Sequence, residues 1–137
     1  MNIKKFLIAF VAVLMFVSLA NFLIHGVLLK PHYAQTSLMR GEADGAVHAP
    51  FLGLAFLFFS LGFVWIYAQG VNSKAFGGQG IRYGLAVWLI TSVAEYLVYY
   101  AVQPWPGNIV CMQIGYELVM NMVAGVIVAA IYRKGTA

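Results

Sequence analysis

Four long apolar stretches dominate this sequence of 137 residues and leave few folds open to it. Residues 6–29 and 49–68 contain no Lys, Arg, Asp or Glu, and residues 83–102 and 109–132 each contain a single acidic residue. A helix needs about 20 apolar residues to cross a bilayer, and none of these stretches alternates like a strand. The sequence therefore predicts an all-α polytopic membrane protein, a four-transmembrane-helix bundle with helices over 6–29, 49–68, 83–102 and 109–132.

The composition also indicates lipid rather than water as the solvent. Apolar residues make up 63% of the chain and charged residues 9%, whereas soluble proteins have about 25% charged residues. Residues 1–137 then form a single transmembrane domain, joined by an outer loop at 30–48, an inner loop at 69–82 and an outer loop at 103–108. We expect membrane lipid as a partner.

The distribution of basic residues predicts an orientation with both ends in the cytoplasm. Cytoplasmic loops favour Lys and Arg. With an N-in/C-in topology the outer side holds only Lys30 and Arg40. The inner side then holds six basic residues: Lys4, Lys5, Lys74, Arg82, Arg133 and Lys134. Because these residues sit in pairs at segment ends rather than in a stripe, the net charge of +4 does not indicate nucleic acid.

The connecting segments contain proline and glycine, which commonly mark turns. Pro31 and Pro50 delimit the first outer loop, in which residues 33–40 are predicted to form a short helix on the membrane surface. In the inner loop we interpret Gly70, Gly77, Gly78 and Gly80 as a flexible turn, because the Gly-Lys-Ser/Thr ending of a phosphate loop is missing. The short loop 103–108 makes the last two helices an antiparallel pair.

Two carboxyl groups inside the predicted helices mark the most informative positions. A charged residue at the centre of a membrane helix costs roughly 2.5–3.5 kcal/mol, so Glu95 and Glu117 need partners. Both lie on the order of 10–12 Å below the outer edge at 1.5 Å per residue, and their helices are neighbours. Residues four apart share a helix face. The resulting polar cluster consists of Asn21, His25, Glu95, Tyr99, Gln113, Glu117 and Asn121, with Thr91 beside it and His48 as a cap at its outer edge.

Several interpretations of this cluster remain open. Polar side chains join membrane helices by hydrogen bonds, and this structural role is the favoured interpretation. Two close carboxylates with His25 also suit a divalent cation or a shared, relayed proton. A haem held by His25 and His48 is the weakest alternative, because the two histidines are not placed for opposed axial ligation. We expect no cofactor, and no arrangement of side chains indicates an enzyme.

Four segments resemble a family of small bacterial four-helix integral membrane proteins of unknown function. They are NFLIHGVLL at 21–29, QGIRYG at 79–84, YYAVQPWPG at 99–107 and GYE at 115–117. The resemblance covers most of the chain. It implies four helices and a multi-pass location in a bacterial inner (plasma) membrane, and it implies no activity.

These observations favour a non-enzymatic accessory or interaction subunit of a membrane complex, bound to other membrane-protein subunits or to itself. The chain is small, has little mass outside the predicted helices and shows no catalytic constellation. The main alternative is a homo-oligomeric transporter or channel for a small solute, proton or cation that uses Glu95 and Glu117. A third is a metal- or haem-binding membrane redox protein using His25, His48, Glu95 and Glu117.

Overall fold

A computed structural model of the chain describes residues 2–70 and 75–133. All regular structure in these residues is helical, which confirms the all-α class. Four helical stretches are long and apolar enough to cross a membrane: Ile3–Leu28, Glu42–Gln69, Phe76–Val102 and Gly107–Tyr132. The first stretch consists of α1 (Ile3–Asn21) and the π-helix η1 (Phe22–Leu28), and a short helix α2 (Lys30–Tyr33) follows it. The second stretch is α3 (Glu42–Gln69), and the fourth is α6 (Gly107–Tyr132). The third consists of α4 (Phe76–Trp88), the π-helix η2 (Leu89–Val93) and α5 (Ala94–Val102).

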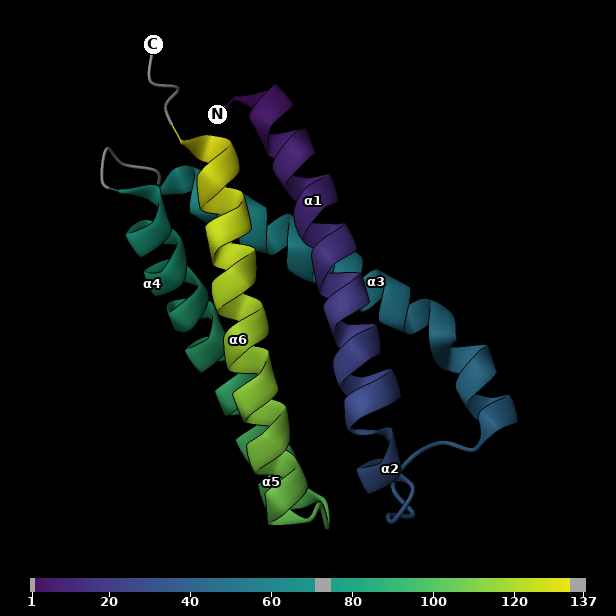
Figure 1. The fold of residues 1–137 in the computed structure, drawn as a ribbon. Coiled ribbons are helices and arrows are strands. Elements are labelled where there is room, and N and C mark those ends of the chain that lie inside the picture. The colour runs from purple at the N-terminus through teal and green to yellow at the C-terminus, as the bar shows by residue number, and fades with distance from the viewer. Residues whose placement is uncertain (1, 71–74, 134–137) are drawn as a thin grey trace.

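The helices α4 and α5 run antiparallel to α6, and α1 packs beside α6 (Figure 1). The start of α1 and the end of α6 lie at the same end of the bundle, where Lys5 Nζ donates a hydrogen bond to the carbonyl oxygen of Arg133 over 3.0 Å. We call this the terminal end. The opposite end, which carries α2 and the α5–α6 connection, is the α2 end.

The contact between α4 and α6 corrects the prediction for the inner loop at 69–82. Helix α4 begins at Phe76 rather than at residue 83, so Gly77, Gly78 and Gly80 are helical. A Cβ atom added at Gly80 would collide with the backbone of Gly125 on α6. Small residues allow helix backbones to approach closely, so Gly80 is a packing residue here and not part of a turn.

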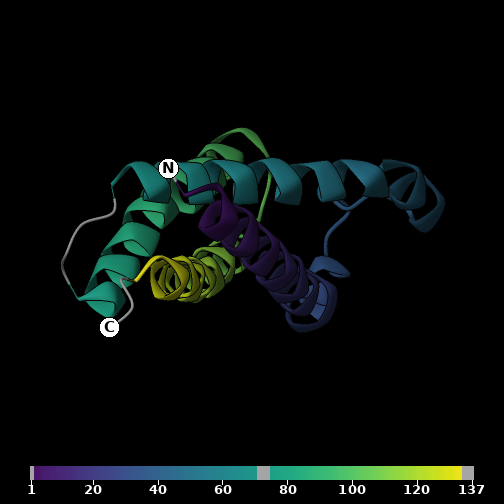
Figure 2. The same cartoon turned by 90° about the horizontal axis from the view of Figure 1, so that it is seen from above.

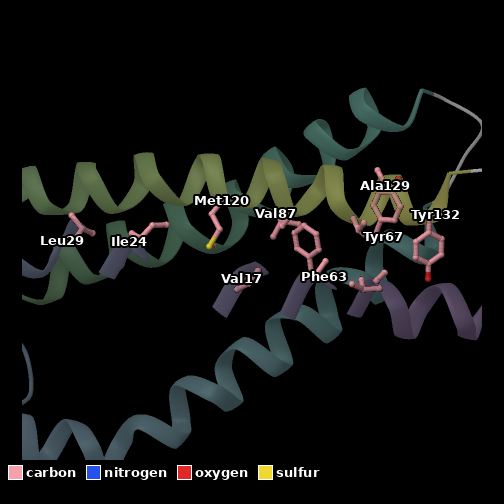
Figure 3. Packing of buried hydrophobic residues seen from close by; sticks show 14 of the residues in the cluster. Val17, Ile24, Leu29, Phe63, Tyr67, Val87, Met120, Ala129 and Tyr132 are labelled. Atoms are coloured by element: carbon pink, nitrogen blue, oxygen red, sulfur yellow. The ribbon is translucent and has the colours of Figure 1, made fainter. Parts of the chain in front are cut away.

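The apolar core follows the line where α1, α3 and α6 meet. Val13, Val64 and Val128 are fully buried there. Figure 3 shows this cluster, with Val17 and Met120 on facing helices near its middle. At the terminal end the core closes with three tyrosine rings. The ring of Tyr67 lies 5.2 Å from that of Tyr83 and 5.8 Å from that of Tyr132 between centroids.

Helix α3 starts earlier than predicted and leaves the bundle. It begins at Glu42 rather than at residue 49, and Pro50 lies inside it. Glu42 and Asp44 occupy its first turn, where acidic groups are stabilised by the helix dipole. Its buried residues all lie between Ser60 and Tyr67. The half toward Glu42 points away from α1 and α6 (Figure 2).

The first connection also differs from the prediction of a helix over 33–40. The short helix is α2, Lys30–Tyr33, and it follows η1 almost without interruption. Pro31 lies in its first turn, a position that requires no backbone donor. The segment therefore folds against the bundle, with Tyr33 buried rather than lying on a surface.

Candidate functional site

Two π-helical segments bring side chains to the same carboxyl group on α6. The segment η1 carries His25, and η2 carries Ser92. A π-helical turn holds one extra residue, which changes the direction of the side chains within it, and such turns are frequent at functional sites. Both His25 and Ser92 turn toward Glu117 on α6.

The carboxylate of Glu117 is the centre of this site. Its Oε1 lies 3.4 Å from Nε2 of His25. Its Oε2 lies 3.4 Å from Oγ of Ser92 and 3.4 Å from Nδ2 of Asn121, which both act as donors. The Glu117 side chain is only 9% exposed. A carboxylate accepts hydrogen bonds only, and three donors from three elements surround it.

A chain of hydrogen bonds links this carboxylate to the α2 end. Nδ1 of His25 lies 2.6 Å from the hydroxyl oxygen of Tyr33, and that oxygen accepts from Nε2 of Gln113 over 3.1 Å. With the Tyr33 hydroxyl donating to His25 Nδ1, the proton on Nε2 of His25 points at Glu117. We define the Glu117 cluster as the six residues His25, Tyr33, Ser92, Gln113, Glu117 and Asn121.

Tyr33 closes the cluster toward the α2 end. Its ring lies nearly parallel to the ring of His25, at an interplanar angle of 4° and 6.0 Å between centroids, and it meets Trp105 edge-on at 5.9 Å between centroids. Burial raises the pKa of the Tyr33 phenol above its ordinary value, the hydrogen bond from Gln113 lowers it, and the nearby Glu117 raises it again. The net rise keeps the hydroxyl protonated, so it remains a donor.

Glu95 does not join Glu117 as the sequence suggested. It is exposed, and its Oε1 accepts a hydrogen bond from the Tyr99 hydroxyl over 2.9 Å on the same helix. Thr91 likewise bonds within its own helix, to the carbonyl of Val87. Glu95 and Glu117 line one cavity of about 340 Å³, so the two carboxylates share a space but have different partners.

Two other predicted positions also lie apart from the Glu117 cluster. Asn21 donates to the carbonyl of Val17 and to Sδ of Met120. His48 lies in the first turns of α3, where its Nδ1 is 2.8 Å from the carbonyl of Asp44, and it does not cap the cluster. Within the described ranges, 2–70 and 75–133, no three His, Cys, Asp or Glu side chains are grouped as a metal site would require.

A larger cavity of about 750 Å³ lies between α1, α3 and α5, toward the α2 end. Helix α3 diverges from α1 toward this end (Figure 2), and residues of both helices line the cavity. Its lining includes His25, Tyr33 and Gln113 of the cluster, the aromatic residues Phe22, Phe56, Tyr96 and Trp105, and the aliphatic Leu52. These three residues of the cluster, together with Ser18, Asn21 and Gln103, give a largely apolar cavity its polar lining.

Sequence reasoning missed Tyr33 and Ser92. Tyr33 was assigned to a surface segment, and no apolar periodicity there indicated that it folds back. Ser92 points at Glu117 because η2 contains an extra residue per turn, and the spacing rule for α-helices does not predict that direction. For Tyr33, the signal that the sequence offers is the neighbouring Pro31, which favours the start of a helix and so predicts a helical turn at Tyr33.

No family model, curated protein or solved structure matches the chain. Functional inference therefore depends on the geometry of the chain's own residues.

Proposed function

We propose that the chain is a non-enzymatic accessory subunit that binds another protein of the bacterial inner membrane through α3. The observation that carries this proposal is the half of α3 toward Glu42, residues 42–55, in which no residue is buried. In a bilayer, such a half-helix is available to a partner.

The surface of this half suits a helix of another subunit. Gly45, Ala49 and Gly53 recur at four-residue spacing and so share a face. A Cβ atom added at Gly45 or at Gly53 would meet nothing within 4 Å. Rows of small residues let membrane helices approach closely, and this row is left open by the chain's own bundle.

The orientation that we propose is N-in/C-in. Lys5 and Arg133 are in contact at the terminal end, and Arg133 lies over the Phe76 ring at the start of α4. Lys30 and Arg40 belong to the α2 end. The excess of basic residues at the terminal end supports a cytoplasmic location for it, and the resemblance of residues 21–29 and 99–107 to bacterial membrane proteins supports the inner membrane. Lys74 and Lys134 lie outside the described residues.

The transporter alternative receives less support. The pair of His25 and Glu117 suits proton exchange, and polar groups connect it to the α2 end. Toward the terminal end, however, the fully buried Val13, Val64 and Val128 fill the core. A polar path through one copy therefore stops at the Glu117 cluster. For the redox alternative, His48 and Glu95 have partners of their own, away from that cluster.

Purification from native membranes in mild detergent tests the proposed function. We expect a tagged chain to recover one larger membrane protein in a fixed ratio, and Gly53→Leu to lower that recovery roughly ten-fold because the added side chain separates the helices. The matched control is Gly115→Leu, since Gly115 on α6 is also exposed and also open.

A pure, monodisperse chain that binds only itself would contradict the proposal. Equal loss of the partner in Gly53→Leu and in Gly115→Leu would do the same, because α3 would then have no special role. A photocrosslinker placed at Ala49 gives a second measurement, and it should join the chain to the same partner protein.

A further inference from the structure

Glu95 is a carboxyl group inside a candidate membrane span that the chain's own charges do not neutralise. It lies about 10 Å from the end of the span Phe76–Val102, at 1.5 Å per residue. It is exposed, and its one hydrogen bond to a described residue comes from the neutral hydroxyl of Tyr99. Within residues 2–70 and 75–133, the ion pairs of acidic side chains involve Glu117 and Asp44, and none involves Glu95. A charge inside a membrane is costly and is usually paired with another group.

Glu95 lines a cavity at the point where α3 leaves the bundle. This is the cavity of about 340 Å³ that Glu117 also lines. Its wall on α3 includes Ala55 and Phe56, at the end of the half of α3 that has no buried residue. Helix α5, which carries Glu95, has no buried residue either. Because α3 diverges toward its Glu42 end (Figure 2), a partner on that half of α3 lies next to this cavity.

The cavity has room for a long side chain but not for a helix. A helix about 10 Å across would fill 340 Å³ with only about 4 Å of its length. A partner helix therefore lies outside the cavity, against the row of small residues on α3, and one of its side chains can reach in. The aromatic rings of Phe56, Phe59 and Tyr96 line the cavity, and such rings attract cations.

Of the two carboxylates in this cavity, Glu95 is the one that can still accept a strong partner. Three donors already surround Glu117. Glu95 accepts a single hydrogen bond through its Oε1, and its Oε2 accepts none from the described residues. A carboxylate can accept several hydrogen bonds, and those from Lys or Arg are the strongest.

A second copy of this chain does not supply the missing cation. Its candidate spans contain only three permanently charged basic residues, Lys4, Lys5 and Arg82. The two lysines are in the first turn of α1, and Arg82 is in α4, so all three lie toward the terminal end (Figure 1). Glu95 lies toward the α2 end. Copies inserted in the same direction keep these charges away from it, so the cation must come from a different protein.

We infer that the partner of α3 carries a Lys or Arg within a transmembrane helix and that this side chain enters the cavity to pair with Glu95. Because the partner is the one proposed for α3, the pairing rests on that proposed function. The stem of the basic side chain passes Ala55 and Phe56, and its charged end donates hydrogen bonds to the carboxylate. Each charge is costly alone in a membrane, so the pair favours this partner over other helices that have small-residue faces.

Recovery of the partner from native membranes in mild detergent tests the pairing. We expect Glu95→Gln to lower the recovery roughly ten-fold, because it removes the charge that strengthens the hydrogen bonds, and Glu95→Lys to abolish it. Glu42→Gln is the matched control, since Glu42 is also exposed but lies in the first turn of α3. Tyr99→Phe should also retain the partner, because it leaves the carboxylate in place. Circular dichroism and size-exclusion chromatography check that each variant is folded.

A charge exchange between the two proteins gives a second measurement. Each Lys or Arg in the transmembrane helices of the partner is replaced in turn by Glu and combined with Glu95→Lys. We expect one of these exchanges to restore recovery to within about two-fold of the unsubstituted pair, as direct coupling of the two positions requires. A merely structural role of Glu95 would not produce this rescue.

The possible outcomes distinguish the pairing from the docking of α3. If Gly53→Leu loses the partner but a folded Glu95→Gln retains it, α3 remains the docking helix and the pairing with Glu95 is wrong. A partner with no Lys or Arg in its transmembrane helices would overturn the pairing as well, and so would failure of every charge exchange. A chain that recovers no other protein would refute both proposals. If Glu95→Gln does not fold, the sequence of the partner and the charge exchange still decide the question.

Discussion

At the scale of single residues, the Glu117 cluster shows how a carboxyl group can be accommodated inside an apolar bundle. Its three donors come from the side chains of His25, Ser92 and Asn121. Hydrogen bonds between membrane helices contribute about 0.6 kcal/mol on average, so no single bond holds the cluster. Their joint effect fixes the direction in which α1 and η2 face α6.

We predict that His25 and Glu117 are energetically coupled. In a double-mutant cycle with His25→Ala and Glu117→Gln, the free energies of unfolding should depart from additivity by about 0.5–1.5 kcal/mol. The cycle is measured by reversible unfolding in mixed micelles. His48→Ala combined with Glu117→Gln is the control and should be additive, since His48 contacts Asp44 instead. Additivity in both cycles would mean that the His25–Glu117 contact carries no energy.

The sequence predicted only part of this cluster, for a physical reason. Gln113, Glu117 and Asn121 lie on one straight α-helix, so the four-residue spacing rule applies to them. Glu95 lies just beyond η2, where the extra residue changes the register that the rule assumes. The similar depth of the two residues on neighbouring helices placed Glu95 beside Glu117, whereas the structure pairs Glu95 with Tyr99.

At the scale of elements, the apolar runs predicted the helices well and their starting points poorly. Length and hydropathy alone decide whether a stretch suits a bilayer, and all four predicted stretches are helical. Glycine has two opposite uses, however, in turns and at close helix contacts. Sequence alone does not separate them, and so the helical Gly77 and Gly78 were assigned to a loop.

The close approach of α4 to α6 gives a prediction at this scale. A Cβ atom at Gly84 would collide with the backbone of Asn121, so Gly84→Ala should lower the free energy of unfolding by about 1–3 kcal/mol. Gly115→Ala is the control. Its Cβ meets nothing within 4 Å, and alanine favours a helix over glycine by about 0.5–1 kcal/mol. If both variants are equally stable in thermal unfolding, the backbones of α4 and α6 are not in close contact at Gly84.

At the scale of the whole molecule, the two ends of the bundle have different characters. The terminal end is closed by three tyrosine rings and by the contact of Lys5 with Arg133. The α2 end is open because α3 diverges, and it holds the larger cavity with its polar lining. The glycine-rich α4 packs closely against α6 toward the terminal end, whereas the half of α3 toward Glu42 contains no buried residue.

Because the two ends differ, the orientation of the bundle decides which side of the membrane the cavity faces. We predict that the α2 end faces outward. In a Cys111→Ala background, which removes the exposed native thiol, a cysteine is introduced at Ser37 or at Ala75. Both positions are exposed, the first beyond α2 and the second just before α4. A membrane-impermeant maleimide should label Ser37→Cys on intact cells, because the α2 end has few of the basic residues that favour the cytoplasmic side. It should label Ala75→Cys only after the cells are opened. The reverse pattern would place the cavity in the cytoplasmic leaflet and would refute the N-in/C-in topology, since the two positions lie at opposite ends of the bundle.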